Sequence, residues 1–322
     1  MTVPEFAVQT AALEALIDQS GLGSVRDLIL GSAVRCFRIF PDGEASGAPL
    51  GTTRLGGVPD LAQGVAWPRD NEGRLANFFG QFDFADLAAR VDAADLPRAG
   101  LLSLFTTELE SAAKPVVVKA LLTRPGASLV RAPAPAHDDD LADPETGMLE
   151  PVFVRFAEGM SLPFHSRAFR RAISAAAPGD GLAGVRTLAA QDGGGAIGQL
   201  LGFATPYDDT DFYRKLYFHR VGRGGYEYLD RWERQDEYDA FVASASGADD
   251  RARIDQAKLR WLFDHGDEIR TAAAEWRLFL RIDSNRAMNL NINDSDPIYF
   301  LMPAADLADG DFSRVEAGIT QG

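Results

Sequence analysis

The sequence predicts an α+β protein built from largely antiparallel sheets with flanking helices. Apolar and polar residues alternate over many short stretches, which is the period of a half-buried strand. Strands are frequent and candidate crossover helices are few, so antiparallel pairing is expected. The 322 residues are 46% hydrophobic and 25% charged, an ordinary composition for a chain that buries a large core.

The N-terminal part of the chain begins with helical spacing and then changes to strands. Thr2 followed by Glu5 has the spacing of a capping box, and the helix that it starts ends before Gly21. Residues 24–30 have the length of a second short helix. We then expect strands at 33–40, 75–84, 101–106 and 116–123, with a helix at 86–95.

The C-terminal part combines longer helices with a second set of strands. The expected helices are 166–177, 228–245 and 249–263. The expected strands are 152–156, 216–221, 276–283, 288–292 and 298–302. Strict alternation in 75–84 predicts that Phe78, Gly80 and Phe82 share one face, and the same pattern in 276–283 puts Leu278 and Leu280 on one face.

Residues 127–150 separate two halves of the chain. This stretch contains a Pro-Ala run followed by three aspartates, and it holds one basic and six acidic residues. Proline removes backbone donors and like charges repel, so we predict an acidic, Pro-rich linker or insertion. It lacks the spacing of a calcium loop, so no metal site is expected in it. The predicted organisation is an N-terminal half, 1–126, and a C-terminal half, 151–322, in one compact body.

A strand unit occurs twice in the sequence. Residues 78–83 and 278–283 match in pattern, and each is an apolar strand that ends in an aspartate. Each is followed by a second apolar strand, 101–105 or 298–302. We therefore predict internally duplicated halves.

Composition argues against several classes of function. The net charge of −15 disfavours nucleic-acid binding, which needs basic surface. No apolar stretch approaches the roughly 20 residues that span a bilayer, so we expect no membrane association and a cytoplasmic location. Cys36 is the single cysteine, which excludes an internal disulfide, and the four histidines lack metal-binding spacing. No cofactor or metal is expected.

Polar residues on the paired strands make up the candidate ligand site. We expect a cleft between the halves to collect Gln81, Asp83, Arg281, Asp283, Asn289 and Asn291, which lie on the less apolar strand faces. Carboxylates and amides together suit a small polar ligand, or acid–base chemistry if burial raises one pKa. The alternative interpretation is structural, because an aspartate that ends a strand caps the next turn and a nearby arginine pairs with it. No catalytic residue is assigned.

Aromatic residues beside turns are candidate interface residues. Trp67 precedes a proline, and Arg223 and Tyr226 lie in a glycine-rich segment. Exposed aromatic residues next to arginine often anchor protein interfaces. The alternative interpretation is that these loops pack against the core.

Motifs spread over residues 30–318 occur in the order of a known family. They are Gly56-Gly57-Val58-Pro59-Asp60-Leu61, Trp67-Pro68, Phe79-Gly80-Gln81-Phe82-Asp83, Gln199-Leu200-Leu201-Gly202-Phe203, 276–283, Leu290-Asn291, Asp306-Leu307 and Asp311-Phe312-Ser313. On these residues the chain resembles the YwqG-like proteins, a bacterial domain of unknown function. The resemblance implies an α+β body with internally similar halves and no transferable activity. The chain departs from the pattern at Arg281, where Gln is usual, and at 291–294, where relatives commonly have Asn-Trp-Gly-Asp.

The sequence favours a noncatalytic protein-interaction or immunity-type protein. The acidic composition and the absence of a recognisable catalytic motif favour this hypothesis, and the family that the chain resembles sometimes occurs in toxin–immunity settings. A protein partner is expected, while the oligomeric state is left open. The alternative is a small-ligand binder or an unrecognised enzyme that uses an inter-half cleft around Asp83 and Asp283.

Overall fold

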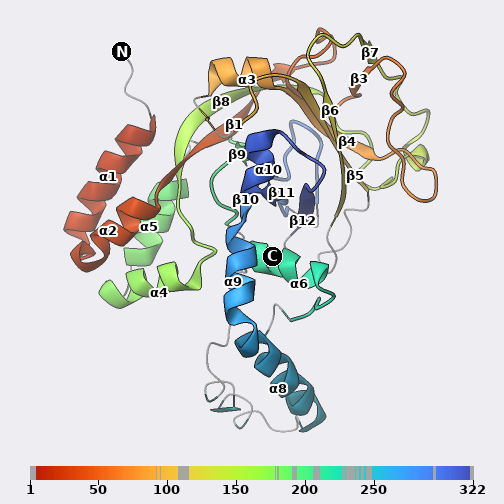
Figure 1. Ribbon diagram of the computed structural model, residues 1–322. Helices are drawn as coiled ribbons and strands as arrows, with labels where there is room; N and C mark the ends of the chain where they lie inside the picture. The colour runs from red at the N-terminus through yellow and green to blue at the C-terminus, as the bar shows by residue number, and fades with distance from the viewer. Residues whose placement is uncertain are drawn as a thin grey trace.

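A computed structural model defines the fold (Figure 1). The structure describes residues 5–91, 93–94, 96–107, 116–177, 179, 181–190, 194–205, 211–226, 229, 236, 239–240, 243, 249–292 and 295–319. Helices and antiparallel strands are both abundant, so the predicted α+β class is confirmed.

Most strands belong to one curved antiparallel sheet. Within the described residues it has ten strands in the order β12-β11-β10-β9-β1-β8-β2-β4-β5-β6, and β3 and β7 form a separate pair. The strands are β1 (Val34–Glu44), β2 (Arg54–Leu55), β3 (Asp60–Ala62), β4 (Asn77–Asp83), β5 (Leu101–Thr107), β6 (Val117–Thr123), β7 (Leu129–Arg131), β8 (Val152–Ser161), β9 (Gly198–Leu200), β10 (Trp276–Ile282), β11 (Ile298–Pro303) and β12 (Glu316–Ile319). The edges meet where Val116 N–H donates to Ala317 O at 2.9 Å.

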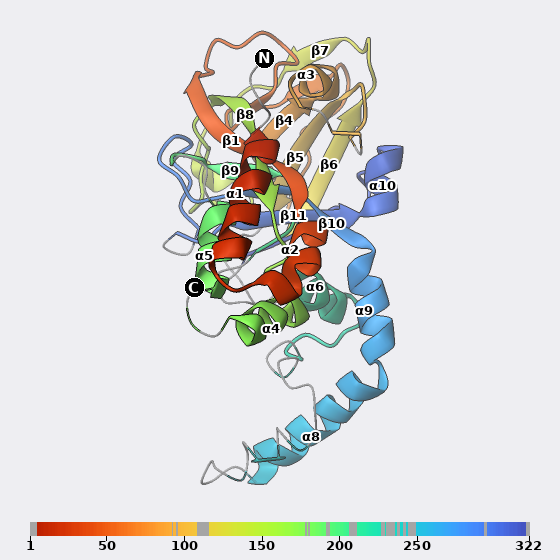
Figure 2. The same cartoon turned by 90° about the vertical axis from the view of Figure 1, so that its left-hand side faces the viewer.

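The helices lie outside the sheet in two main groups. One group packs beside the ends of β1 and β8, and the other leads from the sheet to α8, which projects from the body in two perpendicular views (Figures 1 and 2). The first group is α1 (Glu5–Gln19), α2 (Arg26–Ser32), α4 (Arg167–Ala176) and α5 (Gly181–Ala190). The second is α6 (Phe212–Arg220), α8 (Asp249–Asp264) and α9 (Gly266–Ala274). Shorter helices are η1 (Gly23–Val25), α3 (Phe84–Arg90), η2 (Asp138–Asp140) and α10 (Ala304–Asp309).

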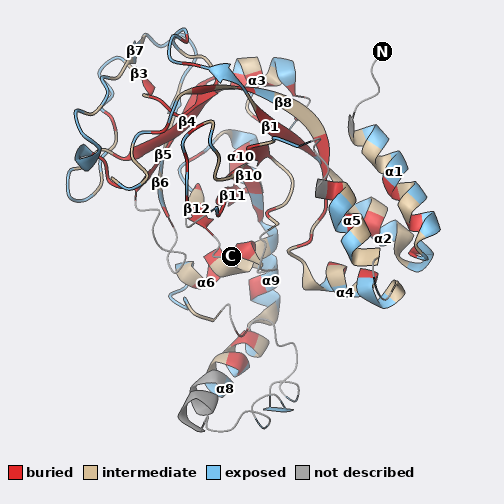
Figure 3. Ribbon diagram, turned by 180° about the vertical axis from the view of Figure 1, so that it is seen from behind, coloured by how far each residue is buried: buried red, intermediate tan, exposed pale blue. Residues whose placement is uncertain are grey.

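The main core lies on the concave side of the curved sheet, where the strands are buried (Figure 3). Phe79 packs against Phe300 with ring centroids 5.6 Å apart, and Phe82 packs against Phe279 at 6.0 Å. These pairs join strands that are far apart in the sheet order, so the curvature brings both ends of the sheet onto one core. Aromatic pairs at this distance add to the free energy gained by burial.

β4 and β10, the strands of the predicted repeat, share one irregularity. The β4–β5 ladder shifts register between Phe78 and Gly80, and the β10–β11 ladder shifts between Leu278 and Leu280. Such a bulge reverses the side-chain alternation beyond it. Phe78 therefore packs in a small outer cluster whereas Phe82 enters the main core, and Leu278 and Leu280 are divided in the same way. The predicted single face is wrong for both strands, and internal duplication stays a prediction.

The strand predicted at 216–221 is wrong, because residues 216–220 belong to helix α6 and Val221 caps its C-terminal end. The side chain of Asp211 caps the helix by accepting from the Arg214 N–H at 3.3 Å. The helix buries Leu216 towards the sheet and Phe218 towards α8 and α9. A short apolar run is compatible with either period, and the cap and two-sided packing favour the helix.

The strand predicted at 288–292 is also wrong, because these residues form a loop closed by side chains. Ser284 Oγ accepts from the Ile292 N–H at 2.9 Å, and Asn285 and Leu290 exchange backbone hydrogen bonds. The alternating apolar side chains of the loop all enter the main core. Alternation here reflects burial of a folded loop and not a strand.

Residues 127–150 contribute to the folded body as well as to the surface. β7 pairs with β3, and the side chains of Leu141 and Leu149 are buried. Asp143 N–H donates to Asn77 Oδ1 at 2.8 Å, which ties the segment to β4. The residues of η2 are exposed.

Two predictions fall on parts of the chain that are not described. Thr2 and most of the helix predicted at 228–245 lie outside the described residues. No helix in the described part of the chain combines the length and apolarity that a bilayer crossing needs.

Candidate functional site

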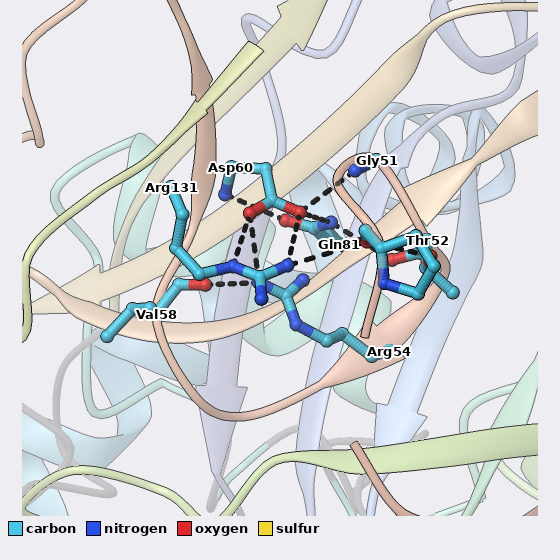
Figure 4. Close-up of polar contacts among 8 residues, drawn as sticks. Gly51, Thr52, Arg54, Val58, Asp60, Gln81 and Arg131 are labelled. Carbon is cyan, nitrogen blue, oxygen red and sulfur yellow. Dashed lines mark hydrogen bonds and ion pairs between the residues drawn. The ribbon is translucent and has the colours of Figure 1, made fainter. Parts of the chain in front are cut away.

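Asp60 is the centre of a buried polar network beneath β3 and β7 (Figure 4). Its side chain is fully buried, and its carboxylate accepts hydrogen bonds from Arg131 Nε at 2.9 Å and from the Gly51 N–H at 2.9 Å. Gln81 Nε2 donates a further bond at 2.8 Å. Arg54 Nη2 lies 3.5 Å from Asp60 Oδ1 and completes the ion network.

Local backbone geometry brings these distant residues together. Gly56 has a φ of 66°, and a Cβ there would lie 2.1 Å from the Glu150 carbonyl oxygen, so only glycine fits this turn. The turn returns the chain to the outer face of β4, where the Asp60 N–H donates to Gln81 Oε1 at 3.0 Å. Gln81 Nε2 also donates to Thr52 O at 2.9 Å, so the amide links β3, β4 and the loop before β2.

The charges of the network hold Asp60 in its ionised form. Burial raises the pKa of Asp60, but the hydrogen bonds from Arg131 and Gln81 and the charge of Arg54 outweigh this effect and leave the pKa below its usual value. Burial lowers the pKa of Arg54 to about 10, and the charge of Asp60 opposes that shift. Asp60 and Arg54 are therefore both charged at neutral pH. An ionised, fully hydrogen-bonded carboxylate anchors the β3–β7 pair and is not a proton donor.

A second buried polar cluster surrounds Arg38 on β1. Its guanidinium donates to Gln199 Oε1, to Met160 O at 3.0 Å and to Ala189 O at 2.7 Å. Ala189 lies in the last turn of α5, where the helix carbonyls carry partial negative charge. Arg38 therefore joins three strands to the helical layer through neutral acceptors.

The six predicted ligand-site residues are divided between β4, the end of β10 and the loop before β11. Gln81 and Asp83 are on β4, whereas Arg281 is on β10 and Asp283 follows it. Four strands separate β4 from β10 in the sheet order. Gln81 belongs to the Asp60 network.

The two predicted aspartates have structural contacts. Asp83 Oδ1 accepts from the Ala85 N–H at 3.0 Å and caps α3, and the Asp83 N–H donates to Thr53 Oγ1 at 3.1 Å. Arg281 Nη2 donates to Asp283 Oδ2 at 2.8 Å, and both side chains are about one fifth exposed. Capping and ion pairing are the two contacts that the structural interpretation of these residues predicts.

Asn289 and Asn291 are exposed residues of the loop between β10 and β11, not residues of a strand face. Asn289 has a φ of 53°, a left-handed conformation that asparagine tolerates better than most residues. The amide that orders this loop is Asn285, which accepts from the Met288 N–H at 2.9 Å.

The predicted interface residues divide between core and surface. Trp67 is 9% exposed, donates from Nε1 to Ala76 O at 2.8 Å and packs near Phe105, so it belongs to the core beneath β3. Arg223 is exposed and Tyr226 is half-buried, after the end of α6. Only this second pair presents an aromatic–cationic surface.

The structure extends that pair into a cluster near the C-terminal end of α8, the projecting helix that we call the arm. We define the arm cluster as Arg223, Tyr226, Lys258, Trp261 and His265. Arg223 lies 5.2 Å from the Trp261 ring and 5.6 Å from the Tyr226 ring, and Lys258 lies 5.5 Å from Tyr226. Trp261 stacks on His265 at 4.4 Å. Cation–π contacts of this kind hold the side chains in fixed orientations.

Sequence reasoning missed the Asp60 network because its ionic members are far apart in the chain. Asp60 was in a motif that supported the family resemblance, but Arg131 lies in the presumed insertion. The available signal was an isolated acid within an apolar run, since such an acid needs a partner when it is buried. Among the described residues, no three His, Cys, Asp or Glu side chains are grouped to hold a metal ion.

A family model described as "Domain of unknown function (DUF1963)" matches residues 53–319. The matched range includes Arg54, Asp60, Gln81 and Arg131 of the network and the whole arm cluster, whereas Arg38 precedes it. No curated protein matches the chain.

Proposed function

The chain belongs to the DUF1963 family, a domain of unknown function, and we propose that it is a noncatalytic protein-interaction or immunity-type protein. We also propose the narrower YwqG-like assignment, a bacterial origin and a cytoplasmic location. The partner in this proposal is another protein that the chain binds and neutralises or adapts.

The arm cluster is the observation that supports this proposal. Tryptophan, tyrosine and arginine dominate the binding energy of protein interfaces. Here Arg223, Tyr226 and Trp261 are already held against one another, so binding immobilises few additional rotamers. Lys258 and Trp261 of the cluster lie on α8, the helix that projects from the body (Figure 2).

The carboxylates of the alternative proposal are engaged elsewhere. Asp83 caps a helix and Asp283 pairs with Arg281. A small-ligand site around them has to replace these contacts, which favours the interaction hypothesis.

The test is capture of a partner from source cells with the tagged full chain, followed by a binding measurement with the purified partner. We expect the double variant R223A/Y226A to weaken binding at least tenfold, because it removes the exposed Arg223 and the half-buried Tyr226 of the arm cluster. R270A is the matched control, since Arg270 is exposed on α9 and, among the described residues, forms its ion pair with the exposed Asp267.

Two results oppose the proposal. Recovery of no stoichiometric partner, or equal binding by R223A/Y226A and the unmodified chain, removes the arm cluster as an interface. A thermal stabilisation by a metabolite fraction that D283N abolishes favours the small-ligand alternative.

A further inference from the structure

β6 forms one edge of the large sheet. It pairs with β5 over its whole length without a register shift. On its other side, the described residues supply a single bridge, from Val116 to Ala317 of β12. Beyond that bridge, the described residues supply no ladder partner on this side for Val118 to Thr123.

The bridge fixes the direction of every backbone group along the edge. Val116 N–H points to β12, and alternate residues of a strand point the same way. The N–H and C=O groups of Val118, Ala120 and Leu122 therefore face away from β5. In the part of the chain that the structure describes, these groups have no ladder partner.

The edge lacks the features that usually protect a sheet from a further strand. Natural edges are short, charged, bulged or interrupted by proline. This strand has seven residues, and Lys119 is its single charge. Val117 is 51% exposed and Leu122 is 40% exposed, while Val118 and Ala120 are only partly covered.

The chemistry of the edge selects an extended peptide. Only another strand offers donors and acceptors at the spacing of the free backbone groups. Residues 116–126 contain Lys119 and Arg124 and no acid, in a chain whose net charge is −15. The local positive charge therefore complements an acidic segment.

We propose that the β6 edge binds an extended segment of a partner protein as an added strand. The segment has apolar side chains at alternate positions and an acidic residue opposite Lys119. This edge is remote from α8 in both views, so the test below is independent of the arm cluster (Figures 1 and 2).

The probe is a phage-displayed library of random nonapeptides selected against the full chain. We expect enrichment of alternating apolar and acidic sequences, and the affinity of a labelled consensus peptide is then measured by fluorescence anisotropy. Ala120→Pro removes an outward N–H and leaves the bonds to β5, so it should weaken binding at least tenfold. Lys119→Glu should weaken it at least threefold.

Val8→Ala is the control, because Val8 is 55% exposed but lies on helix α1, which has no free edge. It should leave peptide affinity unchanged, as should R223A/Y226A. Bound peptide should also slow amide hydrogen exchange at Val118, Ala120 and Leu122 selectively.

The proposal is overturned if no peptide is enriched, or if the enriched peptide binds Lys119→Glu and the unmodified chain equally. If circular dichroism shows that Ala120→Pro does not fold, the Lys119→Glu affinity and the exchange pattern decide. Slowed exchange elsewhere, with no change along β6, also contradicts it.

Discussion

Two regions of the large sheet share a backbone plan but stabilise it with different polar contacts. In the first region, Arg54 on the short strand β2 lies opposite Gln81 on β4. In the second, Gln199 on the short strand β9 lies opposite Arg281 on β10. Arginine and glutamine have exchanged strands, while the pairing is the same.

The turn after each short strand is also the same. Gly56 N–H donates to Phe79 O at 2.9 Å, and Leu201 N–H donates to Phe279 O at 3.0 Å. Both donors are left-handed, with φ of 66° and 60°. The backbone keeps this conformation even where leucine makes it unfavourable, so tertiary hydrogen bonds and not glycine alone determine it.

The difference lies in how each region compensates a buried arginine. Arg54 has the buried carboxylate of Asp60, whereas Arg38 beside Gln199 has neutral carbonyls and the end of helix α5. One region depends on ion pairing and the other on helix placement. Different substitutions should therefore destabilise the two regions, although their strand pairing is the same.

The largest expected effect separates the two regions at Asp60. Asp60→Asn leaves Arg54 buried without a counter-charge, so the free energy of unfolding should fall by about 3–5 kcal/mol. Urea-induced unfolding measures this change in the free energy of unfolding. Asp267→Asn removes a 95% exposed partner of Arg270 and should change stability by less than about 0.5 kcal/mol. A similar small change for both variants contradicts the buried network.

The next effect tests the second region. Arg38→Met leaves buried carbonyl oxygens without donors, and we expect a loss of about 2–3 kcal/mol by the same measurement. Arg35→Met on the same strand removes a more exposed partner of Glu158 and serves as the control. If the two variants lose equal stability, the contacts to Met160 and Ala189 are unimportant.

A third prediction concerns the close approach of β2 to β4 at Gly80 in the first region. A Cβ at Gly80 would lie 2.9 Å from Arg54 O, whereas the corresponding Leu280 already carries a side chain. Gly80→Ala should cost about 1–3 kcal/mol in thermal unfolding. Gly159→Ala on β8, with its nearest atom at 3.5 Å, should cost less. The reverse order refutes the close approach of β2 to β4.

Acid should weaken the first region before the second. The folded-state pKa of Asp60 is below its unfolded value of about 3.9, because the hydrogen bonds from Arg131 and Gln81 and the charge of Arg54 outweigh burial. Its stabilising contribution is therefore present above that unfolded value and is lost as the pH falls through the folded pKa. Between pH 6 and pH 3, the free energy of unfolding should fall less steeply for Asp60→Asn than for Arg38→Met. If the free energy of unfolding falls equally steeply for both variants, Asp60 is not the source of the acid sensitivity.

The smallest effects compare the two aspartates that end the repeated strands. Asp83→Ala removes a helix cap and should cost about 1 kcal/mol. Asp283→Ala removes a partly exposed ion pair and should cost less than about 1 kcal/mol. Thermal unfolding of both variants compares these costs. A larger loss of stability for Asp283→Ala contradicts the predicted order of the helix cap and the ion pair.

Local sequence patterns predicted most strands and the α+β class because alternation and helical spacing are local properties. Residues 101–106 and 116–123 pair in one uninterrupted ladder and were predicted close to their observed bounds. Segments with a short apolar run or a folded loop, such as 216–221 and 288–292, were wrong because local period does not record caps or tertiary packing.

By itself the sequence determined which segments extend, where apolar residues gather and that Asp83 and Asp283 end their strands. Only the tertiary structure decided the bulges in β4 and β10, the partners of Asp60 and the open edge of β6. The physical reason is the separation along the chain over which each interaction acts. Side-chain period and capping act over a few neighbouring residues, whereas a buried charge takes whichever partner the fold brings within hydrogen-bond distance, here Arg131, 71 positions along the chain.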